Sequence, residues 1–257
     1  ILNGTGVILS TNLGRAPLSP GALDVLRESL AGYNNLEFSL ETGERGSRGE
    51  SCERYLAMIA EAEAAVVVNN CAAALFLILN TFANRKPVVI SRGELVQIGG
   101  GFRIPDILRR SGARLIEIGT SNITSLADYE SALDGTTGLI LKVHKSNFAV
   151  TGFTDEVSLE SVADLGWAHG IMVVHDLGSG LVVPTAELFG HPEVSVQQSV
   201  RGGASLTCFS ADKMLGGPQA GVIVGKANEI DRLKKNPLFR TVRADKIIFA
   251  MLEQTAG

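Results

Sequence analysis

The sequence has little that would suit a membrane span, a disulfide framework or a zinc site. Only three of its 257 residues are cysteines, Cys52, Cys71 and Cys208. An odd number of cysteines without CxxC spacing argues against disulfides and against a metal site, so we expect no metal and a reducing cytoplasm. The longest apolar run, residues 71–79, is shorter than the roughly 18 residues of a membrane span, and no signal peptide is visible.

The chain also lacks an excess of either charge. Its net charge is −4, so composition does not indicate nucleic-acid binding beyond a local patch. Hydrophobic residues make up 45% and charged residues 19%, which is typical of a globular protein with a sizeable core. The sequence begins at Ile1 rather than Met, and we expect it to be a piece of a longer protein.

What the chain does contain is a series of short apolar runs separated by turns and helical patterns. Near-continuous hydrophobicity is typical of strands buried on both faces of a mainly parallel sheet. The seven predicted strands are 65–69, 87–91, 114–118, 139–143, 171–175, 205–210 and 222–225. Three predicted helices are 71–82, 158–169, which Gly170 ends, and 228–236. A further helix is predicted to begin at a capping box formed by Ser125 and Asp128.

Alternating strands and helices predict a doubly wound α/β fold with helices on both faces of the sheet. Only a short segment joins 205–210 to 222–225, so these two strands should be antiparallel neighbours. We divide the chain into an N-terminal arm and active-site loop (1–50), a large domain (51–236) and the start of a C-terminal region (237–257).

Candidate site residues follow the strands, because ligands of open α/β sheets bind beyond the carboxyl ends of the strands. Asn70, Cys71 and Ala72 follow the first strand and open a helix, where free N–H groups form an anion cup. A plain strand-to-helix turn would explain them as well. Asp176 follows the fifth strand and Lys213 the sixth.

A lysine, a carboxylate and an anion cup together match the needs of pyridoxal phosphate. This cofactor requires a lysine for its Schiff base, an acid at its ring nitrogen and a cup for its phosphate. Either charged residue alone would more often be structural. Ser179 and Ser210 follow the same two strands and are assigned to the cofactor site. His144 is a candidate ring contact, although a polar loop explains it nearly as well.

Long motifs resemble the bacterial selenocysteine synthase family, the L-seryl-tRNA(Sec) selenium transferases. The most specific are SRGELVQIGGGFRIPDI, KVHKSNFAVTGFT, DLGSG and FSADKMLGGPQAGVIVGK, with TGVILSTNLGRAPLS near the start and NPLFRTVRADK near the end. The resemblance spans essentially the whole chain. It implies a fold-type I pyridoxal-phosphate enzyme in which Lys213 forms the Schiff base and Asp176 contacts the pyridine nitrogen. It also implies that Arg15, Arg240 and Arg243 line a pocket for the anionic selenium donor.

The resemblance further implies partners and an assembly. These are seryl-tRNA(Sec), selenophosphate and a homo-oligomeric ring built from dimers. Two local departures are Cys71, where the family usually has Asn, and Ala211, where it usually has Gly. The family also carries an N-terminal tRNA-gripping domain and a C-terminal small domain, neither of which we recognise in these residues. We therefore expect the sequence to be the catalytic core.

Two alternatives remain open from the residues alone. A pyridoxal-phosphate enzyme acting on a free amino acid, such as a cysteine desulfurase or a β-lyase, would use the same lysine and aspartate. It would need an arginine for the free α-carboxylate, and the chain offers several. A non-catalytic assembly or tRNA-holding module is the other alternative, against which the presence of both Lys213 and Asp176 argues.

Overall fold

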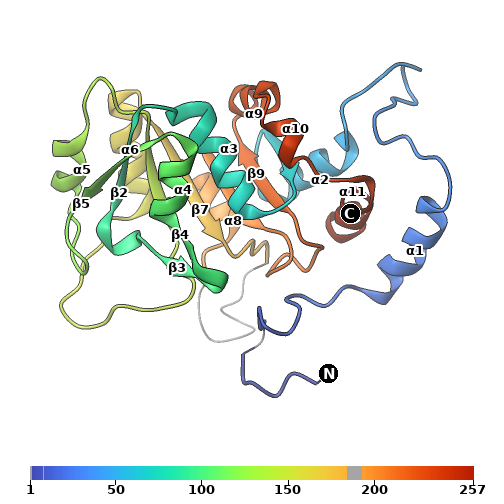
Figure 1. The fold of residues 1–257 in the computed structure, drawn as a ribbon, viewed down its shortest axis with the longest axis horizontal. Helices are drawn as coiled ribbons and strands as arrows, with labels where there is room; N and C mark the ends of the chain where they lie inside the picture. The colour runs from blue at the N-terminus through green and yellow to red at the C-terminus, as the bar shows by residue number, and fades with distance from the viewer. Residues whose placement is uncertain (1, 8, 184–192) are drawn as a thin grey trace.

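A seven-stranded sheet forms the centre of the protein (Figure 1). The structure is a computed structural model that describes residues 2–7, 9–183 and 193–257. The strand order is β1-β9-β8-β7-β6-β2-β5. The strands are β1 (Ala64–Val68), β2 (Pro87–Ser91), β5 (Arg114–Ile118), β6 (Leu139–Val143), β7 (Met172–Gly178), β8 (Leu206–Ser210) and β9 (Gly221–Gly225).

Strand β9 is the antiparallel member of this sheet. It pairs antiparallel with β1 on one side and with β8 on the other, whereas the remaining neighbours pair in parallel. The predicted antiparallel pairing of 205–210 with 222–225 is confirmed. A separate two-stranded sheet joins β3 (Gln97–Ile98) to β4 (Phe102–Arg103), beside two 3-10 turns, Arg92–Glu94 and Gly99–Gly101.

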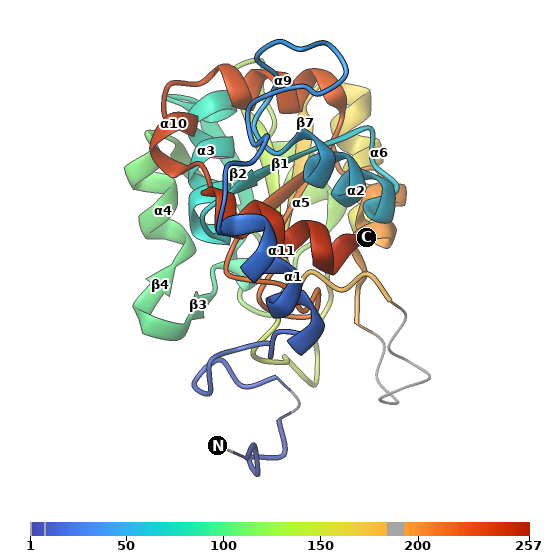
Figure 2. The same cartoon turned by 90° about the vertical axis from the view of Figure 1, so that its right-hand side faces the viewer.

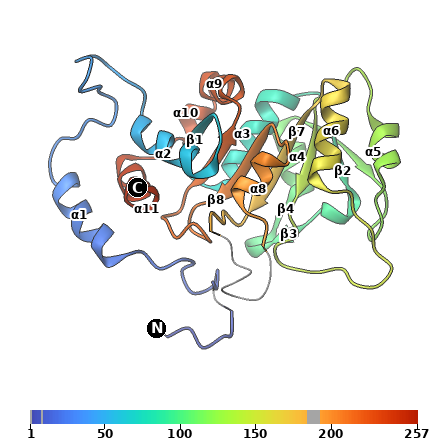
Figure 3. The same ribbon diagram turned by 180° about the vertical axis from the view of Figure 1, so that it is seen from behind.

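Helices cover both faces of the sheet, as Figures 1 and 3 show from opposite sides. One face carries α3 (Cys71–Ala83), α4 (Ile104–Ser111) and α9 (Ala227–Lys235); the other carries α2 (Glu50–Ala60), α5 (Leu126–Ala132), α6 (Leu159–His169) and α8 (Val196–Arg201). Side chains of β1 alternate between the two layers. Val66 and Val68 join the core under α3, and Ala65 and Val67 join the core under α2. Both faces are apolar for this reason, which explains the continuous hydrophobic runs.

Local signals place several helix ends where the sequence predicts them. Ser125 caps α5 in a capping box with Asp128. Ser158 caps α6, and Gly170 ends it in the left-handed conformation that glycine adopts without strain. Among the described helices, none combines the length and the apolarity that crossing a bilayer requires.

The N-terminal arm contains a helix that the sequence did not predict, α1 (Pro20–Leu30). It packs against the last helix, α11 (Lys246–Ala256), which follows the short α10 (Phe239–Val242) (Figure 2). Pro20 begins α1, but no side chain caps its start. Packing against α11, rather than a local signal, therefore accounts for this helix.

Candidate active site at the carboxyl ends of β7 and β8

Lys213 lies in a closed turn between the antiparallel strands β8 and β9. The amide of Ala211 donates to the carbonyl of Ala220 (2.9 Å), and the amide of Gly216 donates to the carbonyl of Lys213 (3.0 Å). The amide of Gly217 also donates to the carbonyl of Ala211 (2.9 Å). These bonds hold the turn, and with it the half-buried Lys213, at the edge of the sheet where β7 and β8 end.

Asp176 and Lys213 face the same point in space beside Gly178. Gly178 has φ of +68°, and a Cβ built on it would lie 3.7 Å from Lys213 Nζ and 3.9 Å from Asp176 Oδ1. The pairing of β7 with β8 is irregular between Asp176 and Gly178, which marks a bulge at the strand end. The two residues that the sequence singles out are therefore brought together.

Burial and charge act in opposite directions on Asp176. Burial raises the pKa of its carboxyl group from 3.8 to about 6, opposed by the positive charge of Lys213 and by hydrogen bonds from the thiols of Cys71 and Cys208. A pKa near 6 leaves most of this carboxyl group ionised at neutral pH. The site therefore holds a buried negative charge beside an amine.

The start of α3 lies at the end of β1, where the sequence predicts an anion cup. Asn70 caps the helix by accepting a hydrogen bond from the amide of Ala73 (2.8 Å), whereas the amides of Cys71 and Ala72 have no partner within the helix. Only glycine at position 221 allows this turn, because a Cβ there would lie 2.2 Å from the carbonyl oxygen of Asn70. Two amides at a helix start suit an anionic ligand.

Two serines and a histidine lie on the adjoining strand ends. The Oγ of buried Ser179 has no hydrogen-bond partner within the described chain. Ser210 is the last residue of β8 and is also buried. The amide of His144 donates to the carbonyl of Asp176 (2.9 Å), while its Nδ1 lies 3.5 Å from Glu193 Oε1 without a hydrogen bond. An unpaired buried hydroxyl is a donor available to a ligand.

Arg15 reaches this edge from the N-terminal arm. Its Nη1 lies 3.0 Å from Asp212 Oδ1, and the amide of Ala16 donates to the carbonyl of Asp212 (3.0 Å). Asp212 directly precedes Lys213. The structure thus pairs one of the three predicted arginines with the residue that precedes the lysine.

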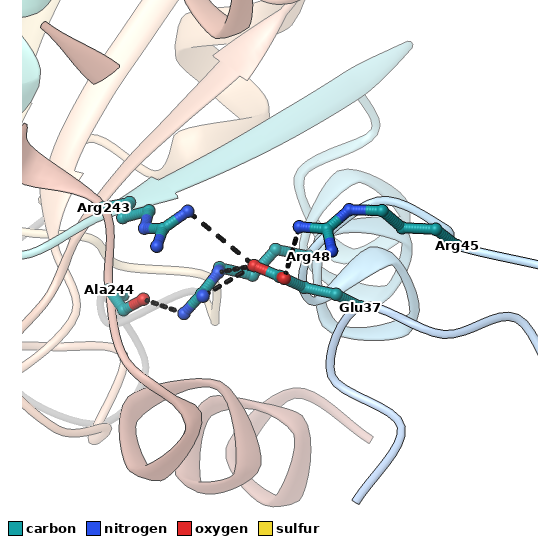
Figure 4. A network of polar contacts seen from close by, with 5 residues as sticks. All are labelled: Glu37, Arg45, Arg48, Arg243 and Ala244. Atoms are coloured by element: carbon teal, nitrogen blue, oxygen red, sulfur yellow. Dashed lines mark hydrogen bonds and ion pairs between the residues drawn. The ribbon is translucent and has the colours of Figure 1, made fainter. Parts of the chain in front are cut away.

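Among the described residues, neither of the other two arginines forms a hydrogen bond or an ion pair with the lysine turn. Arg243 forms a backbone bridge with Val68 at the end of β1, but its side chain points to Glu37 (3.7 Å). Figure 4 shows that Glu37 gathers Arg45, Arg48 and Arg243, and that Arg48 also donates to the carbonyl of Ala244. The hydrogen bond from Arg48 lowers the pKa of Glu37 below its usual value. Within the described part of the chain, no acidic side chain pairs with the exposed Arg240.

The sequence did not identify Asp212, Cys208 or Glu37 as site residues. The position of Asp212 next to Lys213 was a signal that could have identified it. No local sequence pattern marks Cys208 or Glu37. A hollow of about 420 Å³ lies between the arm and helices α2 and α11, and none of the predicted site residues lines it. We therefore place the candidate active site at the strand ends rather than in this hollow.

Solved structures with a similar fold identify the fold class. D-glucosaminate-6-phosphate ammonia-lyase matches with a TM-score of 0.77 at 18% identity, over 95% of this chain and 64% of that chain. An aspartate aminotransferase double mutant from Thermus thermophilus matches with a TM-score of 0.64 at 18% identity, over 93% and 62%. The fold is that of the large domain of fold-type I pyridoxal-phosphate enzymes, a mainly parallel seven-stranded sheet with one antiparallel strand.

The whole sequence also matches one family. Residues 1–257 match the family "SelA: L-seryl-tRNA selenium transferase". The L-seryl-tRNA(Sec) selenium transferase of Aquifex aeolicus is 50% identical over 256 residues, 99% of this chain and 57% of that protein. That of Geotalea daltonii is 52% identical, over 99% and 55%. The chain belongs to this family and spans a little over half the length of these relatives.

Proposed function

We propose that this chain is the catalytic core of an L-seryl-tRNA(Sec) selenium transferase that works with pyridoxal phosphate. The observation that carries the proposal is the meeting of the Lys213 amine and the Asp176 carboxylate beside Gly178. Membership of the family supports the reaction, and the fold class supports the cofactor. The proposal extends to selenophosphate as the selenium donor and to a homo-oligomeric assembly.

The residues present fit pyridoxal phosphate. Lys213 supplies the amine that would attach to its aldehyde, and Asp176 supplies a buried carboxylate for its ring nitrogen. The amides of Cys71 and Ala72 and the unpaired hydroxyl of Ser179 are donors for its phosphate. A buried hydroxyl without a partner is costly in the absence of such a ligand, because its lost hydration is not replaced.

When bound, the cofactor supplies an electron sink for negative charge at the α-carbon of the substrate serine. Asp176 would hold a proton on the ring nitrogen through its negative charge. The Lys213 amine, once released from the cofactor, would take the proton from the serine α-carbon as a general base. Arg15, which pairs with Asp212 next to Lys213 in the chain, would bind the anionic selenium donor, since a guanidinium pairs well with phosphate-type groups. Arg243, whose side chain now faces Glu37, and Arg240 are the other proposed contacts of this donor.

The cofactor assignment is tested by trapping. The chain is incubated with pyridoxal phosphate, reduced with borohydride and digested, and the labelled peptide is identified by mass spectrometry. We expect one stable adduct, on Lys213, and none in Lys213→Ala. Lys235→Ala, which removes a lysine on the exposed side of α9, is the control and should label like the native chain. An adduct that persists in Lys213→Ala would refute the assignment.

The reaction is tested with seryl-tRNA(Sec) and selenophosphate. We expect the aminoacyl group released from the tRNA to contain selenium, and this product to be lost with Lys213→Ala. Free serine and free cysteine are offered in parallel. Turnover of a free amino acid, with none of seryl-tRNA(Sec), would replace the proposal with a lyase or desulfurase activity.

A further inference from the structure

Two thiols and a carboxylate from three separate elements meet at the centre of the candidate site. Cys71 Sγ lies 3.7 Å and Cys208 Sγ lies 3.8 Å from the same atom, Asp176 Oδ1. The three potential ligand atoms all lie within 4.8 Å of one another. Cys208 and Asp176 are buried, and Cys71 is partly exposed at the start of α3, so the group has an approach from solvent.

Strand order explains why these residues meet. Cys208 on β8 stands directly opposite Asp176 on β7 in the parallel register. Cys71 follows β1, which is separated from β8 by β9. Because Gly221 at the start of β9 has no side chain, the turn after β1 passes very close to β9 at this point. The start of α3 therefore lies beside the start of β9 and brings the third ligand to the pair. The spacing of the cysteines along the sequence does not reveal this convergence.

The group has the size and chemistry of a thiolate metal site. Zinc binds cysteine sulfur at about 2.3 Å and carboxylate oxygen at about 2.0–2.2 Å, so in a tetrahedral site two of its ligand atoms lie roughly 3.6–3.8 Å apart. The two sulfur-to-oxygen distances of 3.7 Å and 3.8 Å match this spacing. Thiolates favour thiophilic cations over magnesium or calcium. Two thiolates and a carboxylate exceed the charge of a divalent cation by one. The ammonium group of Lys213, whose charge acts on Asp176, offsets this excess.

We propose that Cys71, Asp176 and Cys208 bind a thiophilic divalent cation of the zinc type in the cofactor-free chain, and that this cation and pyridoxal phosphate exclude each other. Each ligating thiol gives up its proton to water as its sulfur binds the cation, without any redox change. The cation and the cofactor exclude each other because both require the Asp176 carboxylate. This mutual exclusion rests on the proposed function, whereas the cation site does not depend on it.

Metal binding is measured with cobalt(II), which reports thiolate ligation by a charge-transfer absorption. The full chain, freed of cofactor, is titrated with cobalt(II) chloride, and zinc(II) is then added to displace it. We expect one equivalent to bind with the thiolate band. The double variant Cys71→Ser/Cys208→Ser should lose the band and bind about 100-fold more weakly or worse, because most of the binding free energy resides in the thiolate ligands.

The third cysteine provides a matched control. Cys52 is a buried thiol on α2 that lies outside the group, so Cys52→Ala should retain both the band and the affinity. Circular dichroism establishes that each variant is folded, and the two single serine variants replace the double variant if it is not. Absence of the band in the native chain, or its persistence in the double variant, would overturn the cation site.

Competition tests the second half of the proposal. Pyridoxal phosphate at saturation should lower the apparent affinity for cobalt(II) by at least about tenfold, which corresponds to about 1.4 kcal/mol. If cobalt(II) binds equally well to chains in which Lys213 carries the cofactor, mutual exclusion is wrong. If cobalt(II) binds through the thiols but borohydride traps no cofactor on Lys213, the proposed function fails while the cation site stands.

Discussion

The guanidinium of Arg15 lies 3.0 Å from the carboxylate of Asp212, a residue 197 positions later in the chain. The neighbouring amide of Ala16 donates to the carbonyl of Asp212, so the arm and the lysine turn are joined at two points. The arm carries its own helix, α1, whose packing partner is α11. The contact with Asp212 is therefore what relates the first residues of the arm to the candidate active site.

Replacing Arg15 with Ala should release the arm without unfolding the protein. The pair is partly exposed, so we expect a loss of no more than about 1 kcal/mol in the free energy of unfolding. Limited proteolysis followed by mass spectrometry should show faster cleavage before α1. Arg201→Ala, which removes an exposed pair with Glu61, is the control and should leave that cleavage rate unchanged. Equal cleavage in all three chains would contradict the role of this contact.

Asp176 should make the stability of the cofactor-free chain fall as pH rises. The pKa of its carboxyl group is about 6 in the folded chain against 3.8 for the unperturbed group. The folded chain therefore binds more protons between these values, and stability is lost as pH rises through them, by up to about 3 kcal/mol.

Asp176→Asn removes this titration. We expect urea unfolding at about pH 4 and about pH 7 to show that the free energy of unfolding of the variant, relative to that of the native chain, rises by up to about 3 kcal/mol between these two pH values. The difference between the two chains isolates Asp176, because other buried acids titrate in both. Parallel stability profiles would mean that the carboxylate is not buried as the structure shows.

Gly221 should tolerate no side chain. A Cβ at this position would lie 2.2 Å from the carbonyl oxygen of Asn70 and 2.9 Å from the amide nitrogen of Cys71. Gly221→Ala should therefore displace the start of α3, lower the free energy of unfolding by about 2 kcal/mol or more and weaken cofactor binding. Urea unfolding and the borohydride adduct measure the two effects. Gly135→Ala, where nothing lies within 4 Å of the added Cβ, is the matched control and should change neither.

Replacing one member of the buried Lys142–Glu94 pair should lower the free energy of unfolding more than replacing both members. Lys142 Nζ lies 2.5 Å from one oxygen of Glu94, and the other oxygen accepts from the amide of Val143 (2.9 Å). Burial raises the pKa of Glu94 despite the nearby lysine. Lys142→Met leaves this carboxyl group without its cation, and we expect a loss of about 3–5 kcal/mol.

The double variant Lys142→Met/Glu94→Gln should recover part of that loss, because a neutral amide can still accept from Val143. Urea unfolding of both single variants and the double variant completes a mutant cycle. Additive losses, with no recovery in the double variant, would show that the two side chains do not depend on each other.

Most of the sheet could be predicted because most of its strands are short, apolar and buried on both faces, the edge strand β5 with exposed Arg114 and Glu117 excepted. β2, β5 and β6 have the predicted bounds, and every residue of β2 and β6 is buried. β7 extends beyond its prediction to Gly178, because Asp176 keeps its pairing with Cys208 although its side chain is polar. Helix α1 was missed because its contacts lie with α11, at the far end of the sequence.

The sequence by itself indicated that Lys213 and Asp176 would meet, since Asp176 lies near the end of one apolar strand, Lys213 follows the next, and parallel strands end at a common edge. Tertiary structure alone decided that Cys71 reaches Cys208, that Arg15 pairs with Asp212 and that Arg243 turns to Glu37. These contacts depend on the order of the strands and on how closely turns pass one another. Local patterns of hydrophobicity and capping specify the elements but carry no record of which elements become neighbours.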